Sequence, residues 1–333
     1  MQEGLIRMST HLNRRSWLAA AGAALALPQM ASAQGFPNRV VRIVVPYPPG
    51  GPTDALARII ANEIQGDLGQ TVIVENKPGG AGSIGTRGVA RGETDGHTIV
   101  LGNNQTHVNN AFLVKEAGYD PIKDFAPLAG LADLQHVLVV TNALAATKVS
   151  ELVALAKKDP GKFNYGSTGI GSGSHLAMEL FKTRTGTDMT HIPYQGAGPM
   201  AAEVMAGRIE LAFATLPSVL GQIRGGSMRA LAVASLNRAP QLPDVPTLKE
   251  QGLVDSEADS WLALFSPAAT PPEARDRLTK AVLGALGKPA VAEGVVKLGF
   301  ALSLREPAAF ATYHKAEMLK WEAVIKAAKV EPQ

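Results

Sequence analysis

The stretch Val44-Val45-Pro46-Tyr47-Pro48-Pro49-Gly50-Gly51-Pro52-Thr53-Asp54 predicts a strand, a tight turn and the start of a helix. Residues 40–45 form a β-branched apolar run that is typical of a buried strand. Residues 54–66 then carry apolar side chains at helical spacing. Two glycines free the backbone of the turn, and Thr53 or Asp54 suits the N-cap of the helix. This strand-turn-helix unit predicts an α/β fold.

The same rhythm runs along the rest of the chain in two series. Strands are predicted at 40–45, 71–75 and 98–102 in the first series, and at 137–141, 164–165, 189–193, 211–214, 230–234 and 261–266 afterwards. Helical patterns separate them, and helices dominate from residue 272 to residue 328. We therefore expect two similar lobes, each a mainly parallel sheet flanked by helices. The final helical stretch has no predicted strands of its own and is expected to pack on the first lobe.

Composition limits the classes of protein that the chain can belong to. At 333 residues, 46% of them hydrophobic, the chain is long enough for two domains with buried cores. No cysteine is present, which excludes disulfides, thiolate metal sites and a cysteine nucleophile. Lys and Arg number 32 against 29 Asp and Glu, with no basic stripe or aromatic platform. A nucleic-acid binder is therefore not expected.

Residues 1–33 resemble a cleaved signal peptide. Arg14 and Arg15 precede an apolar run over residues 17–27, and Ala31-Ser32-Ala33 has the small-x-small pattern of a cleavage site. The mature chain is expected to begin near Gln34, in the periplasm, and the paired arginines leave twin-arginine export as an alternative to the general route. Met8 is an alternative start. No later stretch has the length of a membrane anchor.

Four polar turns follow predicted strands and precede helical patterns. They cover residues 45–54, 165–175 and 193–199, with a patch of neutral amides at 103–110. Exposed N–H groups at a helix start favour an anion, and ligands of open α/β sheets bind outside the carboxyl ends of strands. Together the turns predict a cleft between two lobes that suits a small carboxylate.

Other chemistries find weaker support. Gly80-Ala81-Gly82-Ser83-Ile84-Gly85 matches a dinucleotide fingerprint, but the acidic residue expected about 20 positions later is missing, so no cofactor is predicted. The histidines lack the spacing of a zinc site, so no metal is predicted. A Ser/His hydrolase remains an alternative, with Ser167, Ser172 or Ser174 as nucleophile and His107, His175 or His191 as base. No serine here has the flanking glycines of a nucleophile elbow.

The motifs in order closely resemble the Bug family of periplasmic solute-binding proteins, which serve tripartite tricarboxylate transporters. They are Val44–Asp54, Val74–Gly80, Asp95–Thr98, Tyr119–Pro121, Asp124-Phe125, Asn164–Ser167, His175–Ala177, Pro193–Gly196 and Leu242–Thr247. The resemblance runs from about Phe36 to the C-terminus.

This resemblance implies a two-lobed, clamshell fold of type II that binds a carboxylate without catalysis and passes it to the membrane subunits of a transporter. Lobe 1 is expected to comprise residues 34–136 and 258–333, and lobe 2 residues 137–257, with crossings near 134–139 and 259–264. We expect a monomer. The resemblance assigns ligand binding to Tyr47, Pro49, Gly50, Gly51, Thr53, Asp54, Thr106, His107, Ser167, Thr168, Gly169, Ser174, His175, Tyr194 and Gly196.

One departure from the family bears on the ligand. Many relatives carry Asp-Asn before Leu-Pro-Ser, whereas this chain has Ala214-Thr215 before Leu216-Pro217-Ser218. If the position of the relatives' Asp faces the cleft, this chain offers only the methyl of Ala214 and the hydroxyl of Thr215 there, and a ligand ammonium finds no carboxylate. The sequence then favours a plain organic acid, such as a C4–C6 dicarboxylate or an aromatic acid, over an amino acid. The alternatives left open are that this pair only packs behind the cleft, and that the protein presents its ligand to a sensor kinase.

Overall fold

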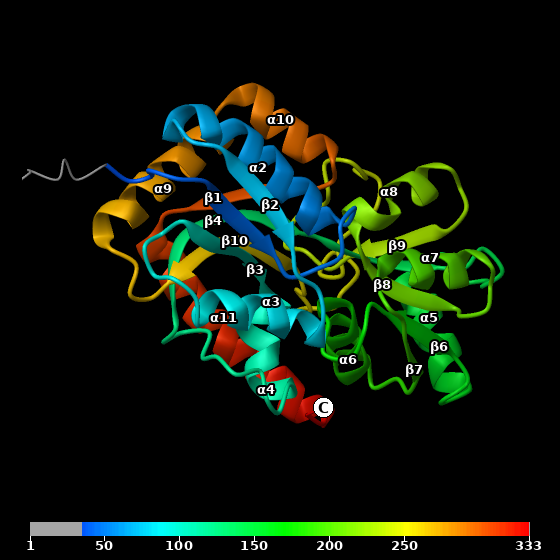
Figure 1. Cartoon of the computed structure of the whole chain (residues 1–333). Coiled ribbons are helices and arrows are strands. Elements are labelled where there is room, and N and C mark those ends of the chain that lie inside the picture. The colour runs from blue at the N-terminus through cyan, green and yellow to red at the C-terminus, as the bar shows by residue number, and fades with distance from the viewer. Residues whose placement is uncertain (1–34, 333) are drawn as a thin grey trace, which may run out of the picture. The chain divides into compact units, whose positions relative to one another are not determined.

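The computed structural model describes residues 35–332, which are built around two β-sheets (Figure 1). Residues 36–332 belong to one compact unit. The predicted signal peptide, residues 1–33, lies outside the described residues. No helix in the described part of the chain is both long and apolar enough to span a membrane.

The first sheet has six strands in the order β11-β4-β10-β3-β1-β2. Strand β1 pairs in parallel with β2 and β3, whereas β10 is antiparallel to β3 and β4, and β11 is antiparallel to β4. Strands from both ends of the described chain therefore build this sheet. Their bounds are β1 (Val41–Val45), β2 (Val72–Asn76), β3 (Thr98–Asn103), β4 (Phe125–Leu134), β10 (Ser260–Pro267) and β11 (Ala301–Arg305).

The second sheet has five strands in the order β7-β6-β8-β5-β9. Strand β6 is parallel to β7 and β8, and β5 is antiparallel to β8 and β9. Only Gln135 separates β4 from β5, so the chain passes directly from one sheet to the other at that residue. The bounds are β5 (His136–Val140), β6 (Asn164–Ser167), β7 (Thr190–Pro193), β8 (Leu211–Thr215) and β9 (Arg229–Val233).

Two lobes of α/β structure are confirmed, but the sheets are mixed where mainly parallel sheets were expected. The difference comes from the strands next to the passages between the lobes, β4, β5 and β10, which all run antiparallel to their neighbours. The expectation that residues 272–328 lack strands was also wrong, because β11 lies among them. Strand β4 is rich in Ala and Gly, and β11 is a partly exposed edge strand, so neither has a strong strand pattern.

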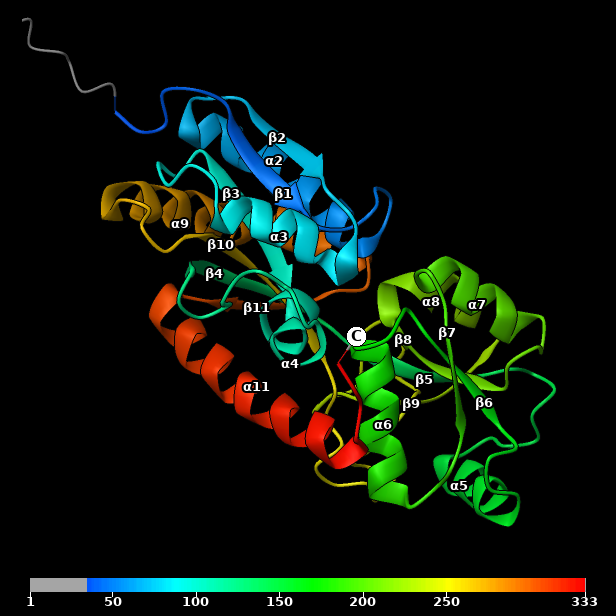
Figure 2. The same ribbon diagram turned by 60° about the horizontal axis from the view of Figure 1, so that its bottom comes forward.

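Helices cover both faces of each sheet (Figures 1 and 2). One face of the first sheet packs against α2 (Pro52–Leu68), α9 (Pro272–Leu286) and α10 (Pro289–Lys297), and the other against α3 (Ser83–Ala90), α4 (Asn110–Leu113) and α11 (Pro307–Ala328). In the second sheet, α5 (Val149–Lys158) and α6 (Gly173–Thr185) cover one face. Helices α7 (Ala197–Met205) and α8 (Leu216–Arg224) cover the other.

The alternation of side-chain direction along the strands explains why helices cover both faces of each sheet. Ile43 and Val45 of β1 belong to the core under α2, while Val44 between them belongs to the core on the opposite face. The same alternation places Val137 and Leu138 of β5 in two different cores. Because both faces of β1 and β5 are buried, these two strands are largely apolar, which is why they were detectable in the sequence.

One of these cores runs without a break through both lobes. It contains Trp261 of β10 and Trp321 of α11 together with Leu138 of β5 and Phe181 of α6. Helix α11 contacts α6 directly, and Figure 2 shows the end of α11 beside α6. The lobes are thus packed together on the side that carries α11.

Candidate ligand-binding site

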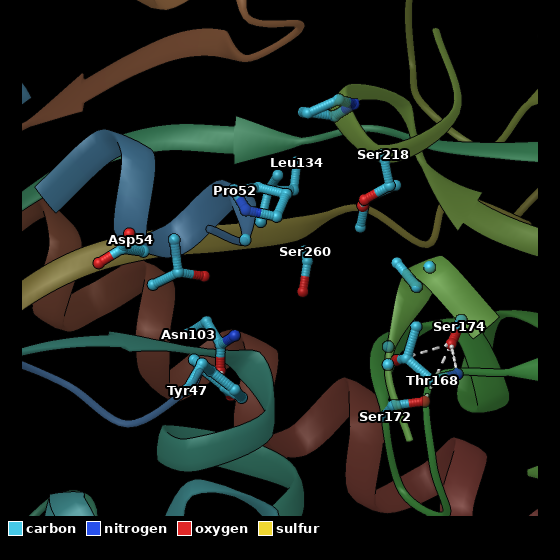
Figure 3. A pocket seen from close by; sticks show the side chains of 18 of the residues that line it. Tyr47, Pro52, Asp54, Asn103, Leu134, Thr168, Ser172, Ser174, Ser218 and Ser260 are labelled. Carbon is cyan, nitrogen blue, oxygen red and sulfur yellow. Dashed lines mark hydrogen bonds between the residues drawn. The ribbon is translucent and has the colours of Figure 1, made fainter. Parts of the chain in front are cut away.

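A cleft of about 710 Å³ lies between the turns of the two lobes. Figure 3 shows Ser260 between Tyr47, Pro52 and Asn103 on one side and Thr168, Ser172 and Ser174 on the other. The lining also includes residues from strand ends and from the segment between α10 and β11. The complete lining is Tyr47, Pro48, Pro49, Gly50, Gly51, Pro52, Thr53, Asp54, Ala55, Asn103, Gln105, Leu134, His136, Thr168, Ser172, Gly173, Ser174, Gln195, Gly196, Ala197, Gly198, Pro199, Thr215, Pro217, Ser218, Ser260, Leu298 and Phe300.

Four helices begin at this cleft. The N-cap residues are Gly51 for α2, Ser172 for α6, Gly196 for α7 and Thr215 for α8, and all four line the cavity. The first N–H groups of a helix have no partner within the helix, and the helix dipole makes its N-terminus favourable for negative charge. Four helix starts around one cavity therefore make it suitable for an anion.

Asp54 holds the first turn in shape and is not free to bind a ligand directly. Its carboxylate accepts hydrogen bonds from Gly50 N–H (3.0 Å), Arg58 Nε (2.9 Å) and Asn76 Nδ2 (3.0 Å). Burial raises the pKa of Asp54, but the hydrogen bonds from Arg58, Gly50 and Asn76 together outweigh it and hold this pKa below its usual value. Asp54 therefore stays ionised and anchors the turn to α2 and β2.

This anchoring changes the role expected for Gly50. Its N–H donates to Asp54, so Gly51 and Thr53 supply the turn's remaining amide donors for a ligand. Gly50 itself has a φ of +85°, in the left-handed region, and a Cβ atom added to it would meet nothing within 4 Å. Glycine is required here by the backbone conformation, since neighbouring atoms leave space for a side chain.

The start of α6 carries a network of three hydroxyls. Ser174 Oγ lies 2.9 Å from Ser172 Oγ and 3.1 Å from Thr168 Oγ1, and it accepts from Thr168 N–H at 2.9 Å (Figure 3). Ser172 Oγ accepts from His175 N–H at 3.3 Å. The N–H groups of Gly173 and Ser174 make no hydrogen bond among the described residues. The network thus fixes the turn and leaves two backbone donors at the cleft.

Electrostatically the cleft is almost neutral. No Lys or Arg of residues 35–332 lines it, and Asp54, whose oxygens are occupied, is the single ionised side chain of the lining. Thr215 lies in the lining, with its Oγ1 2.7 Å from Ser218 Oγ. Ala214, the position of the relatives' Asp, is fully buried in the core and outside the lining, so of this pair only Thr215 faces the cleft. An anion would therefore be held by backbone amides, hydroxyls and side-chain amides, without a cationic partner.

Ten of the predicted site residues line the cleft, and six do not. The ten are Tyr47, Pro49, Gly50, Gly51, Thr53, Asp54, Thr168, Ser174, Gly196 and Thr215. The structure places Thr106, His107, Ser167, Gly169, His175 and Tyr194 outside the lining. His107 is fully buried and stacks on Phe265 at a centroid distance of 3.8 Å, and burial lowers its pKa well below the usual value.

The other five residues outside the lining support the turns. Thr106 Oγ1 accepts from Asn103 N–H at 3.1 Å, and Ser167 Oγ accepts from Gly169 N–H at 3.2 Å. His175 Nδ1 accepts from Gly171 N–H at 3.1 Å, and Tyr194 N–H donates to Ser167 O at 3.0 Å. These residues stabilise the loops through hydrogen bonds, while neighbouring residues of the same loops reach the cleft.

Sequence reasoning missed several lining residues. Leu134, His136 and Ser260 come from the strands where the chain passes between the sheets, and Leu298 and Phe300 come from the segment before β11. None follows a glycine-rich turn, so no local pattern marks them. Asn103 and Gln105 do lie in the predicted amide patch, which was the available signal for them.

The chain matches, over residues 56–330, the family described as TctC, the tripartite tricarboxylate transporter family receptor. The chain belongs to this family.

TctC-family relatives support the assignment over nearly the whole chain. Protein BugT of Bordetella pertussis is 33% identical, with 89% of this chain and 91% of that protein covered. The structure of Rpa4515 from R. palustris with adipate is 34% identical with a TM-score of 0.84, and covers 90% of this chain and 100% of that one. MatC from Rhodopseudomonas palustris with bound malate is 31% identical with a TM-score of 0.80, covering 87% and 100%.

Membership of the TctC family confirms the predicted binding-protein fold and the function as a solute-binding receptor. The family is one of periplasmic, non-enzymatic transporter receptors, so the hydrolase alternative is wrong. The structure does bring one of these serine and histidine pairs together. Ser167 Oγ does lie 2.6 Å from His191 Nε2, but Ser167 is fully buried and outside the cleft, and burial lowers the pKa of His191 to about 4.

Proposed function

We propose that this TctC-family receptor captures a small organic carboxylate between α2 and α6 and delivers it to the membrane subunits of a tripartite tricarboxylate transporter. The observation that carries the proposal is the convergence of four helix starts on a cleft without Lys or Arg in its described lining. Adipate and malate are bound by two relatives, and both are dicarboxylates. Hydrogen bonds to a charged group contribute about 1.5–3 kcal/mol each, so a few amides suffice for the affinity.

The binding residues proposed are those that reach the cleft. On the side of α2 they are Tyr47, Gly51 and Thr53, with Pro49 and Asp54 shaping the turn. On the side of α6 they are Thr168 and Ser174, and Gly196 and Thr215 complete the second lobe's contribution. We exclude His107 from ligand contact because it is fully buried in an aromatic cluster.

The ligand proposed is a plain organic acid of C4–C6 length or an aromatic acid. A ligand ammonium group would need an anionic partner in the cleft. Thr215 offers only a hydroxyl, and Asp54 already receives three hydrogen bonds. An ammonium would therefore lose hydration without gaining an ion pair. Leu134, Leu298 and Phe300 give the cavity an apolar section that suits a methylene chain or a ring.

Isothermal titration tests both parts of this proposal. Succinate, adipate and benzoate are compared with aspartate and 2-aminoadipate, with one ligand bound per protein and no product formed. We expect the plain acids to bind more tightly than their amino counterparts. Tighter binding of aspartate than of succinate would contradict the proposed ligand class, and failure of every carboxylate to bind would contradict the proposed function.

We further propose that the chain is exported, cleaved after Ala33 and active as a monomer, with lobe boundaries at 34–136 plus 258–333 and 137–257. Mass spectrometry of the periplasmic protein checks the cleavage and is expected to find Gln34 at the N-terminus. Replacing Arg14 and Arg15 together by Lys distinguishes the two export routes. Loss of export in that variant favours the twin-arginine route, and unchanged export favours the general one.

A further inference from the structure

His136 presents one ring nitrogen to the cleft as a hydrogen-bond acceptor. Its Nδ1 lies 2.8 Å from Ala258 O. A carbonyl oxygen can only accept, so Nδ1 carries the proton, and in the neutral ring Nε2 then carries a lone pair. Burial lowers the pKa of His136 to about 4, which keeps the ring neutral at physiological pH. No hydrogen bond among the described residues reaches Nε2.

Ser260 stands beside this acceptor. A Cβ atom added to Gly173 would lie 2.9 Å from His136 Cε1, 3.3 Å from His136 Nε2 and 3.3 Å from Ser260 Oγ, so the His136 ring and the Ser260 hydroxyl border the same narrow space at the start of α6. Both residues line the cleft although they are only 2% and 7% exposed, respectively. Ser260 Oγ has no hydrogen-bond partner among the described residues, and Figure 3 shows this hydroxyl in the gap between the two sides of the site.

The space lies next to the two backbone N–H groups that are left as donors at the start of α6. Gly173 and Ser174 are the first residues of α6, and their N–H groups are free of partners within the described chain. A carboxylate on these amides would bring its neighbouring carbon toward Gly173, His136 and Ser260. A hydroxyl on that carbon could donate to Nε2 and accept from Ser260 Oγ, whereas a methylene would leave both atoms without a partner.

We propose that His136 and Ser260 form a hydroxyl-recognising subsite that makes the receptor selective for 2-hydroxy acids over the corresponding unsubstituted acids. This inference rests on the proposed carboxylate function and names a narrower ligand class for the same cleft. Sites that hydrogen-bond a hydroxyl discriminate against analogues that lack it, because buried polar groups then remain unpaired. The size of this preference depends on how well a water molecule replaces the ligand hydroxyl when an unsubstituted acid binds. Two neutral hydrogen bonds support a preference for the hydroxy acid of about tenfold, equivalent to about 1.4 kcal/mol.

Titration calorimetry with matched acids tests the subsite. The pairs are malate against succinate and 2-hydroxyadipate against adipate, and the quantity compared is the ratio of Kd values within a pair. In the wild-type protein we expect the hydroxy acid to bind about tenfold more tightly. In Ser260→Ala the ratio should fall severalfold, with the Kd of the unsubstituted acid nearly unchanged.

Two substitutions of His136 separate its two nitrogens. His136→Asn keeps an amide donor near the position of Nδ1, for the Ala258 carbonyl, and removes the acceptor at Nε2. His136→Gln keeps an acceptor near Nε2. We expect the preference to disappear in His136→Asn and to persist in part in His136→Gln. If a variant is poorly folded by circular dichroism, the Ser260→Ala comparison decides the question.

The outcomes are distinguishable from failure of the general proposal. If succinate and malate bind equally well, the carboxylate function stands and the hydroxyl subsite is wrong. If the preference exists but Ser260→Ala and His136→Asn change both Kd values of a pair by the same factor, these residues do not form the subsite. If no acid of either pair binds, both proposals fall together.

Discussion

Tyr47 Oη donates a hydrogen bond to Asn103 Oδ1 across 2.8 Å, joining the turn after β1 to the end of β3. Thr106 N–H donates to the same oxygen at 3.2 Å, so this atom must be the carbonyl oxygen of the amide. Asn103 Nδ2 makes no hydrogen bond among the described residues, and the side chain lines the cleft. Tyr47 thus orients an amide donor toward the place where we expect an anion.

Asn103→Asp should abolish carboxylate binding. The substitution keeps the size of the side chain but replaces two donor hydrogens by a negative charge in a cleft without a cation in its described lining. We expect at least about a hundredfold rise in Kd by calorimetry, as lost hydrogen bonds to a charged group add to repulsion. Asn142→Asp, which places the same charge outside the cleft, is the control and should bind like the wild type. If Asn142→Asp weakened binding as much as Asn103→Asp, a local role of the Asn103 amide in ligand binding would be contradicted. Tyr47→Phe, which removes the hydrogen bond to Asn103, should weaken binding by a smaller factor.

Gly50→Val should weaken binding through the backbone of the first turn. Its φ of +85° is strained for a β-branched residue, so the turn and its Asp54 hydrogen bond are expected to shift. Gly69, at the far end of α2, has a φ of +69° and equally open space, which makes Gly69→Val a matched control. Both variants should lose about 1–2 kcal/mol of unfolding free energy in urea titrations. Only Gly50→Val should lose affinity, and unchanged affinity there would show that this turn does not hold the ligand.

Asp259→Asn should stabilise the protein at alkaline pH. Burial raises the pKa of Asp259 to about 7, and the charge of Asp133 contributes to the rise. The hydrogen bond that Ser235 Oγ donates to Asp259 at 2.6 Å and the charge of Lys320 both oppose this rise. From about pH 4 to pH 7 the folded state holds a proton that the unfolded state has released, so Asp259 lowers stability as pH rises through this window. Asn cannot ionise and still accepts from Ser235. Thermal unfolding should give the variant a Tm about 2–4 °C above the wild type at pH 8, with a smaller difference at pH 5. A constant difference across this range would contradict the assignment.

His175 and His191 should remain neutral in the folded protein. Their rings stack at a centroid distance of 4.0 Å, and burial lowers their pKa values to about 3 and about 4. Because the unfolded histidines bind protons near pH 6.5, these residues reduce stability as pH falls below that value. Nitrogen-15 NMR of the rings should show no titration between pH 5.5 and pH 8. A ring with an ordinary midpoint would mean that the stack is open to solvent.

Much of the fold could be predicted because its signals are local. The turn at Gly50-Gly51 lies between a continuous apolar strand and an amphipathic helix, and each part has its own periodicity. The pairing direction of β4 and β10 could not be predicted in this way, since it depends on where the chain passes between the sheets. Strand β11 was not predicted at all, because a partly exposed edge strand has little apolar pattern.

The sequence by itself determined the polar turns, the family resemblance and the suitability of a nearly neutral site for an anion. These features depend on glycines, hydroxyl side chains and helix starts, each of which can be recognised in a few consecutive residues. Only the tertiary structure decided which of these residues reach the ligand. His107 and Ser167 are close in sequence to lining residues, yet they are fully buried, while His136 and Ser260, 124 positions apart, line the same wall. The physical reason is that the orientation of a side chain on a strand, and the strand's position in a sheet, depend on pairing between segments that are distant in sequence.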